Sequence, residues 1–243
     1  MFYFSGGAIF LRHKPTSSWE VYEKNRFSVA AAILAAGVLL AGCSSKVAET
    51  TQYSGFLQDY SKLQKTETAS GHQVLRWIAP GFKESDYRGI YISPLVFYPP
   101  AKPSARVSQE TLDKIREYAS TKLRAAVAER TTLLPSPAGS RVLVAKVAIT
   151  AVTAENEDLQ FYEVVPIGAV IATTMAASGH RTQNTTLFME IKLIDQDTGK
   201  TVLAVVRKGY GKSVSNDSTP ITIADVKKAI DDMVTDIVNF PRF

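Results

Sequence analysis

The chain reads LFMEIKLI at residues 187–194, DQDTGK at 195–200 and TVLAVVRKGY at 201–210. The first segment alternates, so one face carries only apolar side chains, whereas Glu190 and Lys192 lie on the other face. The apolar face consists of Leu187, Met189, Ile191 and Leu193. Asp195 and Asp197 suit a turn because aspartates bond nearby backbone N–H groups, and Gly199 suits a positive φ. We therefore predict an antiparallel hairpin whose strands span 187–194 and 201–210.

Two amphipathic helices are predicted on either side of this hairpin in the sequence. The first spans 109–130, with Ser108 as its N-cap and with Val107 and Leu112 placed as a hydrophobic staple. Its apolar stripe consists of Leu112, Ile115, Ala119, Leu123, Ala126 and Val127. The charges off this stripe are interpreted as a solvated face: Lys114, Glu117, Lys122 and Arg124.

The second helix spans 222–239 and begins with a variant of the capping box, Thr222 with Asp225. Its apolar residues recur at helical spacing, and we expect it to end near Asn239, before Pro241. They are Val226, Ala229, Ile230, Met233, Val234 and Ile237.

Two further strands are predicted before the hairpin. Residues 141–152 are apolar on both faces over part of their length, which is typical of a central strand covered on both sides. Residues 90–98 have strand composition but are interrupted by Pro94, which lacks the N–H that a central ladder needs. We therefore expect an edge strand or a bent segment there.

Four connecting segments carry weaker signals. We interpret 55–63 as a short helix or turn, 155–158 as an acidic solvated loop and 209–219 as a glycine-containing flexible loop. The run 166–178 does not alternate as a membrane-spanning strand would, and it is too short for a membrane-spanning helix. We predict a short helix there, or a helix followed by a tight turn, buried inside the domain.

These elements define a fold class. A strand, a helix and a second strand, followed by an antiparallel hairpin, produce a mixed sheet rather than a purely parallel one. We therefore predict an α+β fold with two layers: a mixed, mainly antiparallel sheet with the helices 109–130 and 222–239 packed on it.

The beginning of the chain carries an export signal. Lys24 and Arg26 precede 16 uncharged residues, 27–42, which are too few to span a bilayer comfortably but suit a secretory signal. Residues 1–23 contain no recognisable export element, so we interpret them as an upstream extension, with the true start near Val21.

The segment Leu40-Ala41-Gly42-Cys43 resembles the bacterial lipobox, in which the cysteine is acylated and becomes the first mature residue. Since stable anchoring needs more than one acyl chain, we expect a multiply acylated Cys43. By resemblance to enterobacterial sorting, the absence of aspartate at Ser44 favours the outer membrane. The expected organisation is a signal at 1–42, a lipidated tether at 43–52 and one globular domain at 53–243.

Composition excludes several classes of function. The mature chain would have 201 residues and a net charge of only +3, without a basic stripe, so no nucleic-acid partner is expected. Cys43 is the one cysteine, so neither a disulfide nor a thiol nucleophile would remain. His72 and His180 lack ligand spacing, and the chain has no phosphate-binding loop or nucleophile elbow. We therefore expect no catalytic, metal-binding or cofactor-binding residues.

Several short motifs occur along the mature chain: Gly55-Phe56-Leu57, Asp59-Tyr60, Leu63, Arg76-Trp77, the stretch 94–99, and Val107-Ser108 with Leu112. Together they resemble a bacterial lipoprotein family known as the domain of unknown function 3313. The similarity covers nearly the whole mature chain and implies a lipoprotein without a known activity. At the level of the fold, the chain also resembles envelope lipoproteins of the curli-secretion channel type and the amino-terminal domain of TolB.

The sequence therefore predicts a lipoprotein on the periplasmic face of the outer membrane of a Gram-negative bacterium. We expect a binding or assembly component of the envelope that is not an enzyme and that has an envelope protein as its partner. Two alternatives stay open: an oligomeric secretion-associated lipoprotein, and a periplasmic enzyme. The enzyme would require a pocket that groups His72 or His180 with a carboxylate and a hydroxyl.

Overall fold

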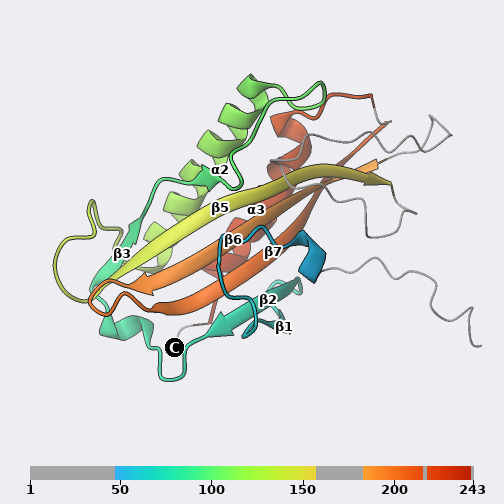
Figure 1. Ribbon diagram of the computed structural model, residues 1–243. Helices are drawn as coiled ribbons and strands as arrows, with labels where there is room; N and C mark the ends of the chain where they lie inside the picture. Colours follow the sequence, from blue (N-terminus) through green and yellow to red (C-terminus); the bar gives the residue numbers. More distant parts are fainter. Residues whose placement is uncertain (1–46, 157–182, 216–217, 242–243) are drawn as a thin grey trace, which may run out of the picture. The chain divides into compact units, whose positions relative to one another are not determined.

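The structure is a computed structural model, and it describes residues 47–156, 183–215 and 218–241. The described residues form one seven-stranded sheet, whose strand order is β1-β2-β7-β6-β5-β3, with the short β4 also paired to β5 (Figure 1). All pairs are antiparallel except β3 with β5 and β4 with β5. The strands are β1 (Gln64–Glu67), β2 (Gln73–Ile78), β3 (Gly89–Ile92), β4 (Val96–Phe97), β5 (Val142–Asn156), β6 (Gln183–Asp195) and β7 (Thr201–Val214).

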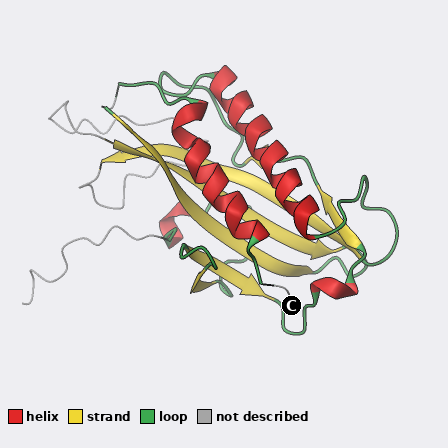
Figure 2. Ribbon diagram, turned by 180° about the vertical axis from the view of Figure 1, so that it is seen from behind, coloured by secondary structure: helices red, strands yellow, loops and turns green. Residues whose placement is uncertain are grey.

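Two helices, α2 (Gln109–Arg130) and α3 (Ile223–Val238), cover one face of this sheet (Figure 2). Two short 3-10 helices, η2 (Thr50–Gln52) and η3 (Glu84–Asp86), complete the described helical elements. The predicted α+β class with a mixed, mainly antiparallel sheet is therefore confirmed. The caps are confirmed too: Ser108 accepts a hydrogen bond from the Thr111 N–H, and Thr222 forms a capping box with Asp225.

The predicted hairpin is β6 and β7, which pair from Gln183 with Val214 to Ile194 with Thr201. Asp195 Oδ1 accepts hydrogen bonds from the N–H groups of Asp197 and Thr198, and Gly199 has a φ of +68°. The apolar face of β6 packs toward α2 and α3, together with the apolar face of β5 on the same side of the sheet. The alternation in the sequence thus identified the correct face of the strand.

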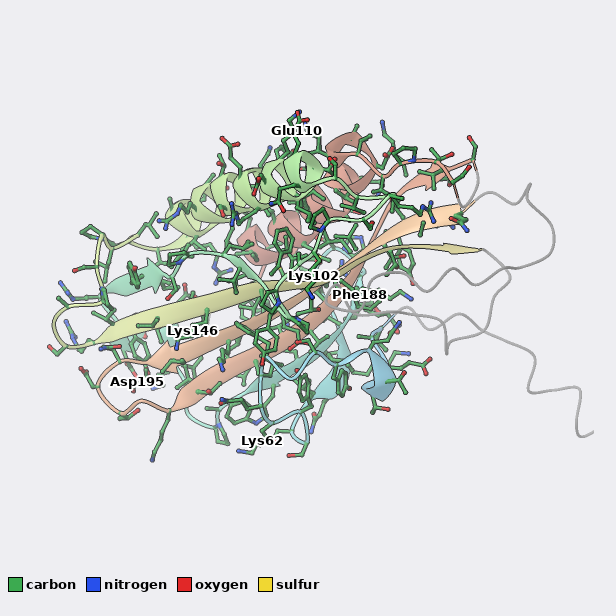
Figure 3. The ribbon with its side chains drawn as sticks, turned by 45° about the horizontal axis from the view of Figure 1, so that its top comes forward. Lys62, Lys102, Glu110, Lys146, Phe188 and Asp195 are labelled. Atoms are coloured by element: carbon green, nitrogen blue, oxygen red, sulfur yellow. The ribbon has the colours of Figure 1, made fainter. Side chains whose placement is uncertain are left out.

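The opposite face of the sheet is covered by a segment that includes the end of the expected tether and the expected short helix or turn at 55–63. We call Val47–Leu63 the strap; it crosses the sheet on the side away from the helices (Figure 1). Val47, Ala48 and Leu57 are buried, and the rings of Tyr53 and Tyr60 stack with their centroids 4.3 Å apart. Packing thus begins at Val47, within the range expected to be a tether. In Figure 3, Lys62 on the strap and Glu110 on α2 lie on opposite sides of the sheet.

The connecting segments differ from expectation at several places. Gly209 and Gly211 lie inside β7 and not in a loop. Glycine is needed at these positions because α3 packs too closely on the strand to leave room for a side chain. The backbone of Glu155 and Asn156 continues β5 by pairing with β6, so these two residues of the predicted acidic loop lie in a strand. Residues 55–63 form bends and turns, in agreement with the turn that was one of the two alternatives predicted there. The predicted helix at 166–178 lies outside the described residues, as do Glu157 and Asp158.

Candidate functional site

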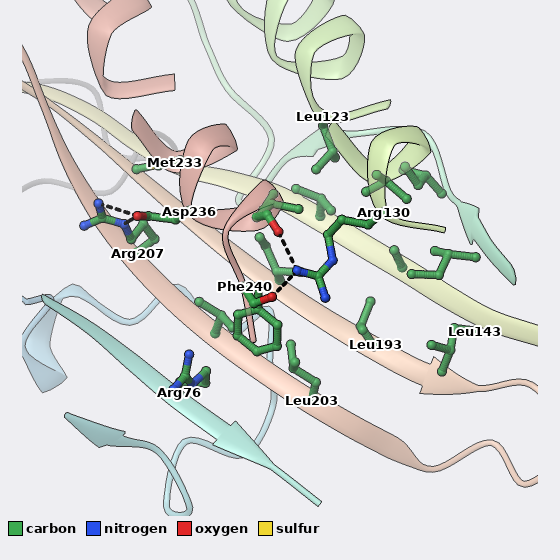
Figure 4. Close-up of a pocket in the computed structure, with 18 of the residues that line it drawn as sticks. Arg76, Leu123, Arg130, Leu143, Leu193, Leu203, Arg207, Met233, Asp236 and Phe240 are labelled. Atoms are coloured by element: carbon green, nitrogen blue, oxygen red, sulfur yellow. Dashed lines mark hydrogen bonds and ion pairs between the residues drawn. The ribbon is translucent and has the colours of Figure 1, made fainter. Parts of the chain in front are cut away.

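A cavity of about 140 Å³ lies between the sheet and the two helices (Figure 4). The alternation of β5, β6 and β7 points one row of each strand into it, and α2 and α3 close it from the other side. The aliphatic lining includes Leu123, Leu143, Val147, Met189, Leu193, Leu203, Val205 and Met233. A partly open space of this kind, walled mainly by aliphatic side chains, suits an apolar ligand group.

Five charged side chains also line the cavity, and four of them form ion pairs. Arg130 bonds Glu84 at 2.7 Å, with only 9% of the Arg130 side chain and 20% of the Glu84 side chain exposed. Arg207 donates to Asp236 from Nε at 2.9 Å and lies 2.8 Å from it through Nη2. The fifth charge is Arg76, on β2, and no carboxylate of the described residues lies within ion-pair distance of its guanidinium.

Arg76 is half-buried, and burial lowers the pKa of its guanidinium from the ordinary value. Its polar contact is a long one, 3.5 Å to Thr66 Oγ1. The ring of Phe240, just beyond the end of α3, lies between two guanidiniums, with its centroid 4.9 Å from Arg76 and 5.5 Å from Arg130. In Figure 4, Phe240 lies between the end of α3 and the sheet, on the side of the cavity where Arg76 lies. The cavity is therefore apolar inside and positively charged at this end.

The structure groups His72 with a carboxylate and a hydroxyl, as the enzyme alternative requires. His72 Nδ1 lies 3.1 Å from Asp236 Oδ1, and Thr68 Oγ1 donates to the same oxygen at 2.8 Å. In a nucleophile–base pair, however, the hydroxyl must bond the imidazole that takes its proton. Here the hydroxyl bonds the carboxylate, which Arg207 also engages. The arrangement ties α3 to the turn between β1 and β2 and lacks the bond that would activate a nucleophile. His180 lies outside the described residues.

A second buried polar cluster fastens the strap to the sheet. The Glu190 side chain is fully buried; its Oε1 accepts from the Ser54 N–H at 3.0 Å and its Oε2 accepts from the Tyr60 hydroxyl at 2.6 Å. Lys192 Nζ donates to the Phe56 carbonyl at 3.0 Å. Phe188, labelled in Figure 3, is buried beside them on the same face of β6. The polar face of β6 thus supplies the attachment points of the strap.

We expect Tyr60→Phe to lower the free energy of unfolding by about 2 kcal/mol, because it removes a hydrogen bond to a buried carboxylate. Tyr91→Phe is the matched control, since the Tyr91 hydroxyl bonds no described residue, and it should change stability by less than about 0.5 kcal/mol. Urea denaturation of both variants measures the difference. Equal stability of the two variants would contradict the role of Tyr60 as an anchor of the strap.

Ionisation of the Tyr60 hydroxyl should make the stability of the fold depend on pH. Burial, and then the hydrogen bond to Glu190, raise the pKa of Tyr60 from 10.0 to about 12. Because the folded-state pKa is the higher one, Tyr60 stabilises the fold fully below about pH 10 and loses this contribution between about pH 10 and 12. Tyr60→Phe should therefore flatten the fall in stability across that interval.

The single site residue predicted from the sequence, Cys43, lies outside the described residues. Sequence reasoning missed the cavity and Arg76 as a charge without a partner. Within the described ranges, no group of three or more histidine, cysteine, aspartate or glutamate side chains could hold a metal ion. No helix of these ranges is long and apolar enough to cross a membrane.

Fold and site together define the protein as a two-layer α+β domain with a largely apolar cavity between its helices and its sheet. The model of the family described as "Protein of unknown function (DUF3313)" matches residues 52–237, and the chain belongs to this family. It is 47% identical over 201 residues to the "Uncharacterized lipoprotein YdcL" of Escherichia coli K12, covering 83% of this chain and 90% of the relative. The protein of the same name in Escherichia coli O157:H7 gives the same values. The family resemblance is therefore confirmed.

Solved structures show a more distant similarity. A PelC dodecamer from Paraburkholderia phytofirmans is 11% identical, with a TM-score of 0.31, and covers 69% of this chain and 98% of that chain. The hypothetical protein CT253 from Chlamydia trachomatis is 11% identical, with a TM-score of 0.37, and covers 63% of this chain and 97% of that chain.

Proposed function

We propose that the protein is a lipoprotein, anchored to the outer membrane through acylated Cys43, that acts as a non-catalytic binding component on the periplasmic face. The lipobox-like segment at 40–43 supports the anchor, and so does the similarity to a protein named as a lipoprotein. The largely apolar cavity between the helices and the sheet supports binding. The absence of a hydroxyl–imidazole bond in the His72 cluster supports a non-catalytic role.

The position of the strap is the observation that carries this proposal. Val47 is already buried against the sheet, only four residues after Cys43. Since an extended chain spans at most about 3.6 Å per residue, these four steps reach no more than about 14 Å. A lipid on Cys43 would therefore hold the domain against the membrane surface and not at the end of a long linker. The cavity lies on the other face of the sheet, in the same domain, so the anchor would keep it near the membrane surface as well. This position suits the capture or presentation of a ligand at the membrane.

The anchor is tested by Cys43→Ser in cells fed labelled palmitate. We expect loss of the label and loss of the protein from the outer-membrane fraction of a density gradient, because the chain has no other cysteine. Ser44→Asp is the matched control: it should keep the label but shift the protein toward the inner membrane. Label that persists on Cys43→Ser would overturn the proposed anchor.

A further inference from the structure

The walls of the cavity set the size and polarity of the group it can hold. Its volume is about 140 Å³, and most of its lining is formed by aliphatic side chains from five strands and both helices. An engineered apolar cavity of about 150 Å³ in another protein stays dry and binds benzene. The present cavity therefore has room for about six carbon atoms without rearrangement. The aliphatic side chains that form most of its walls offer no hydrogen bond to a polar group of a ligand.

The charges at the Phe240 end set the chemistry of the remainder of the ligand. Glu84 and Asp236 neutralise Arg130 and Arg207, so the five charged lining groups leave one positive charge, that of Arg76. Removing a guanidinium partly from water costs free energy, and without a carboxylate beside it part of this cost is not compensated. A carboxylate or a phosphate would compensate this charge, because both accept the paired hydrogen bonds that a guanidinium donates.

Phe240 marks the place where such a head group would bind. Its ring is the present neighbour of Arg76, and the contact is a cation–π interaction with a centroid distance of 4.9 Å. A cation–π contact with a phenyl ring is weaker than the paired, charge-assisted hydrogen bonds that an anion would accept from the guanidinium. An anionic head group could therefore displace the ring from Arg76, while Arg130 stays held by Glu84 and by the carbonyl groups of Ile237 and Phe240.

We propose that the cavity binds an amphiphile with one aliphatic chain, about six carbons of which enter the cavity, and with a carboxylate or phosphate head group on Arg76. This deepens the proposed function and rests on it, since a binding component at a membrane surface would meet such molecules there. Two sources fit this chemistry: a free fatty acid and a single-chain phospholipid.

Photo-crosslinking of the full-length lipoprotein in phosphatidylcholine nanodiscs tests this proposal. Three eight-carbon probes carry the same diazirine at the chain end and differ in the head group: carboxylate, phosphate or alcohol. Peptide mapping should place the label of at least one anionic probe on the cavity-lining parts of β6 and β7, at least tenfold above the alcohol. Labelling by the carboxylate alone indicates a fatty acid, and labelling by the phosphate alone a single-chain phospholipid; either supports the shared chemistry.

Variants of Arg76 separate head-group recognition from simple partition. In Arg76→Leu, the ratio of labelling by the anionic probe to labelling by the alcohol should fall to about one, without a loss of labelling by the alcohol. Arg76→Lys should keep most of this ratio. Arg116→Leu, on the outer face of α2, is the matched control and should behave as wild type. Circular dichroism melts establish that each variant is folded.

Two outcomes would overturn the proposal: no label in the cavity from any probe, or equal labelling by all three probes regardless of Arg76. Neither outcome bears on the anchor, which the palmitate experiment tests independently. Conversely, a protein that lost its membrane sorting could still show the preference for anionic probes. Failure of the ligand assignment and failure of the proposed function are thus distinguishable.

Discussion

Asp236→Ala is expected to lower the free energy of unfolding by about 3–5 kcal/mol, because it leaves a buried arginine without its partner. Only 8% of the Arg207 side chain and 8% of the Asp236 side chain are exposed. The same carboxylate also accepts from Thr68 at 2.8 Å and lies 3.1 Å from His72 Nδ1. One substitution therefore removes the link between β7, α3 and the turn between β1 and β2. Urea denaturation followed by circular dichroism measures the loss.

Asp232→Ala is the matched control on the same helix. Asp232 pairs with Lys228 at 2.5 Å, but 63% of the Lys228 side chain and 29% of the Asp232 side chain are exposed. Such pairs contribute about 0.5 kcal/mol or less. The double variant Arg207→Leu with Asp236→Leu should recover much of the loss, because it removes both buried charges. If Asp236→Ala costs no more than Asp232→Ala, the buried pair does not secure α3.

The elements that could be predicted from the sequence are those with a local signal. Helix 109–130 was predicted to the residue, because its N-cap, staple and apolar stripe all lie within the segment itself. The β6–β7 hairpin was predicted for the same reason, since alternation and turn chemistry are local. Its ends were not: β6 begins at Gln183 and β7 ends at Val214, where pairing with neighbouring strands decides the boundary.

The strap and the β1–β2 hairpin could not be predicted, because their conformation depends on distant partners. Ser54 and Tyr60 bond Glu190, which lies 136 and 130 residues further along the chain. Strand β1 is the polar tetrapeptide QKTE at the edge of the sheet, with neither alternation nor strand propensity. Antiparallel pairing with β2 makes it a strand.

The candidate site has no local signal for a different reason. A cavity is a volume that the side chains of six or more elements leave unfilled, so no single segment encodes it. Arg76 was noted from the sequence only within a family motif, and its lack of a carboxylate partner depends on the positions of Glu84 and Asp236 in space. Fold class was therefore accessible from periodicity, whereas the site required the packing of the helices on the sheet.

Gly211→Ala is expected to lower the free energy of unfolding by about 3 kcal/mol or more, at the upper end of overpacking substitutions. A Cβ atom at Gly211 would lie 2.0 Å from the Asp225 carbonyl oxygen and 2.4 Å from Thr185 Oγ1. The first of these atoms belongs to the backbone of α3, and the second is held by hydrogen bonds to the carbonyl groups of Lys212 and Asp225. Neither can turn away as a flexible side chain would. Gly211 is not among the glycines with a positive φ, so the cost arises from space alone.

Two controls isolate the close approach of α3 to β7. A Cβ atom at Gly209 would meet the mobile end of a methionine, Met233 Cε, at 2.7 Å and Ala229 Cβ at 3.2 Å, so Gly209→Ala should cost less, about 1 kcal/mol. Lys212→Ala, at an exposed position of the same strand, should change stability by less than about 0.5 kcal/mol. In thermal melts, the melting temperature of Gly211→Ala should therefore lie far below those of the other two variants. Equal melting temperatures for Gly211→Ala and Lys212→Ala would show that the first turn of α3 can move away from the sheet. The close approach at Gly211 would then contribute nothing to stability, and the glycine would be a loop residue, as its sequence context suggests.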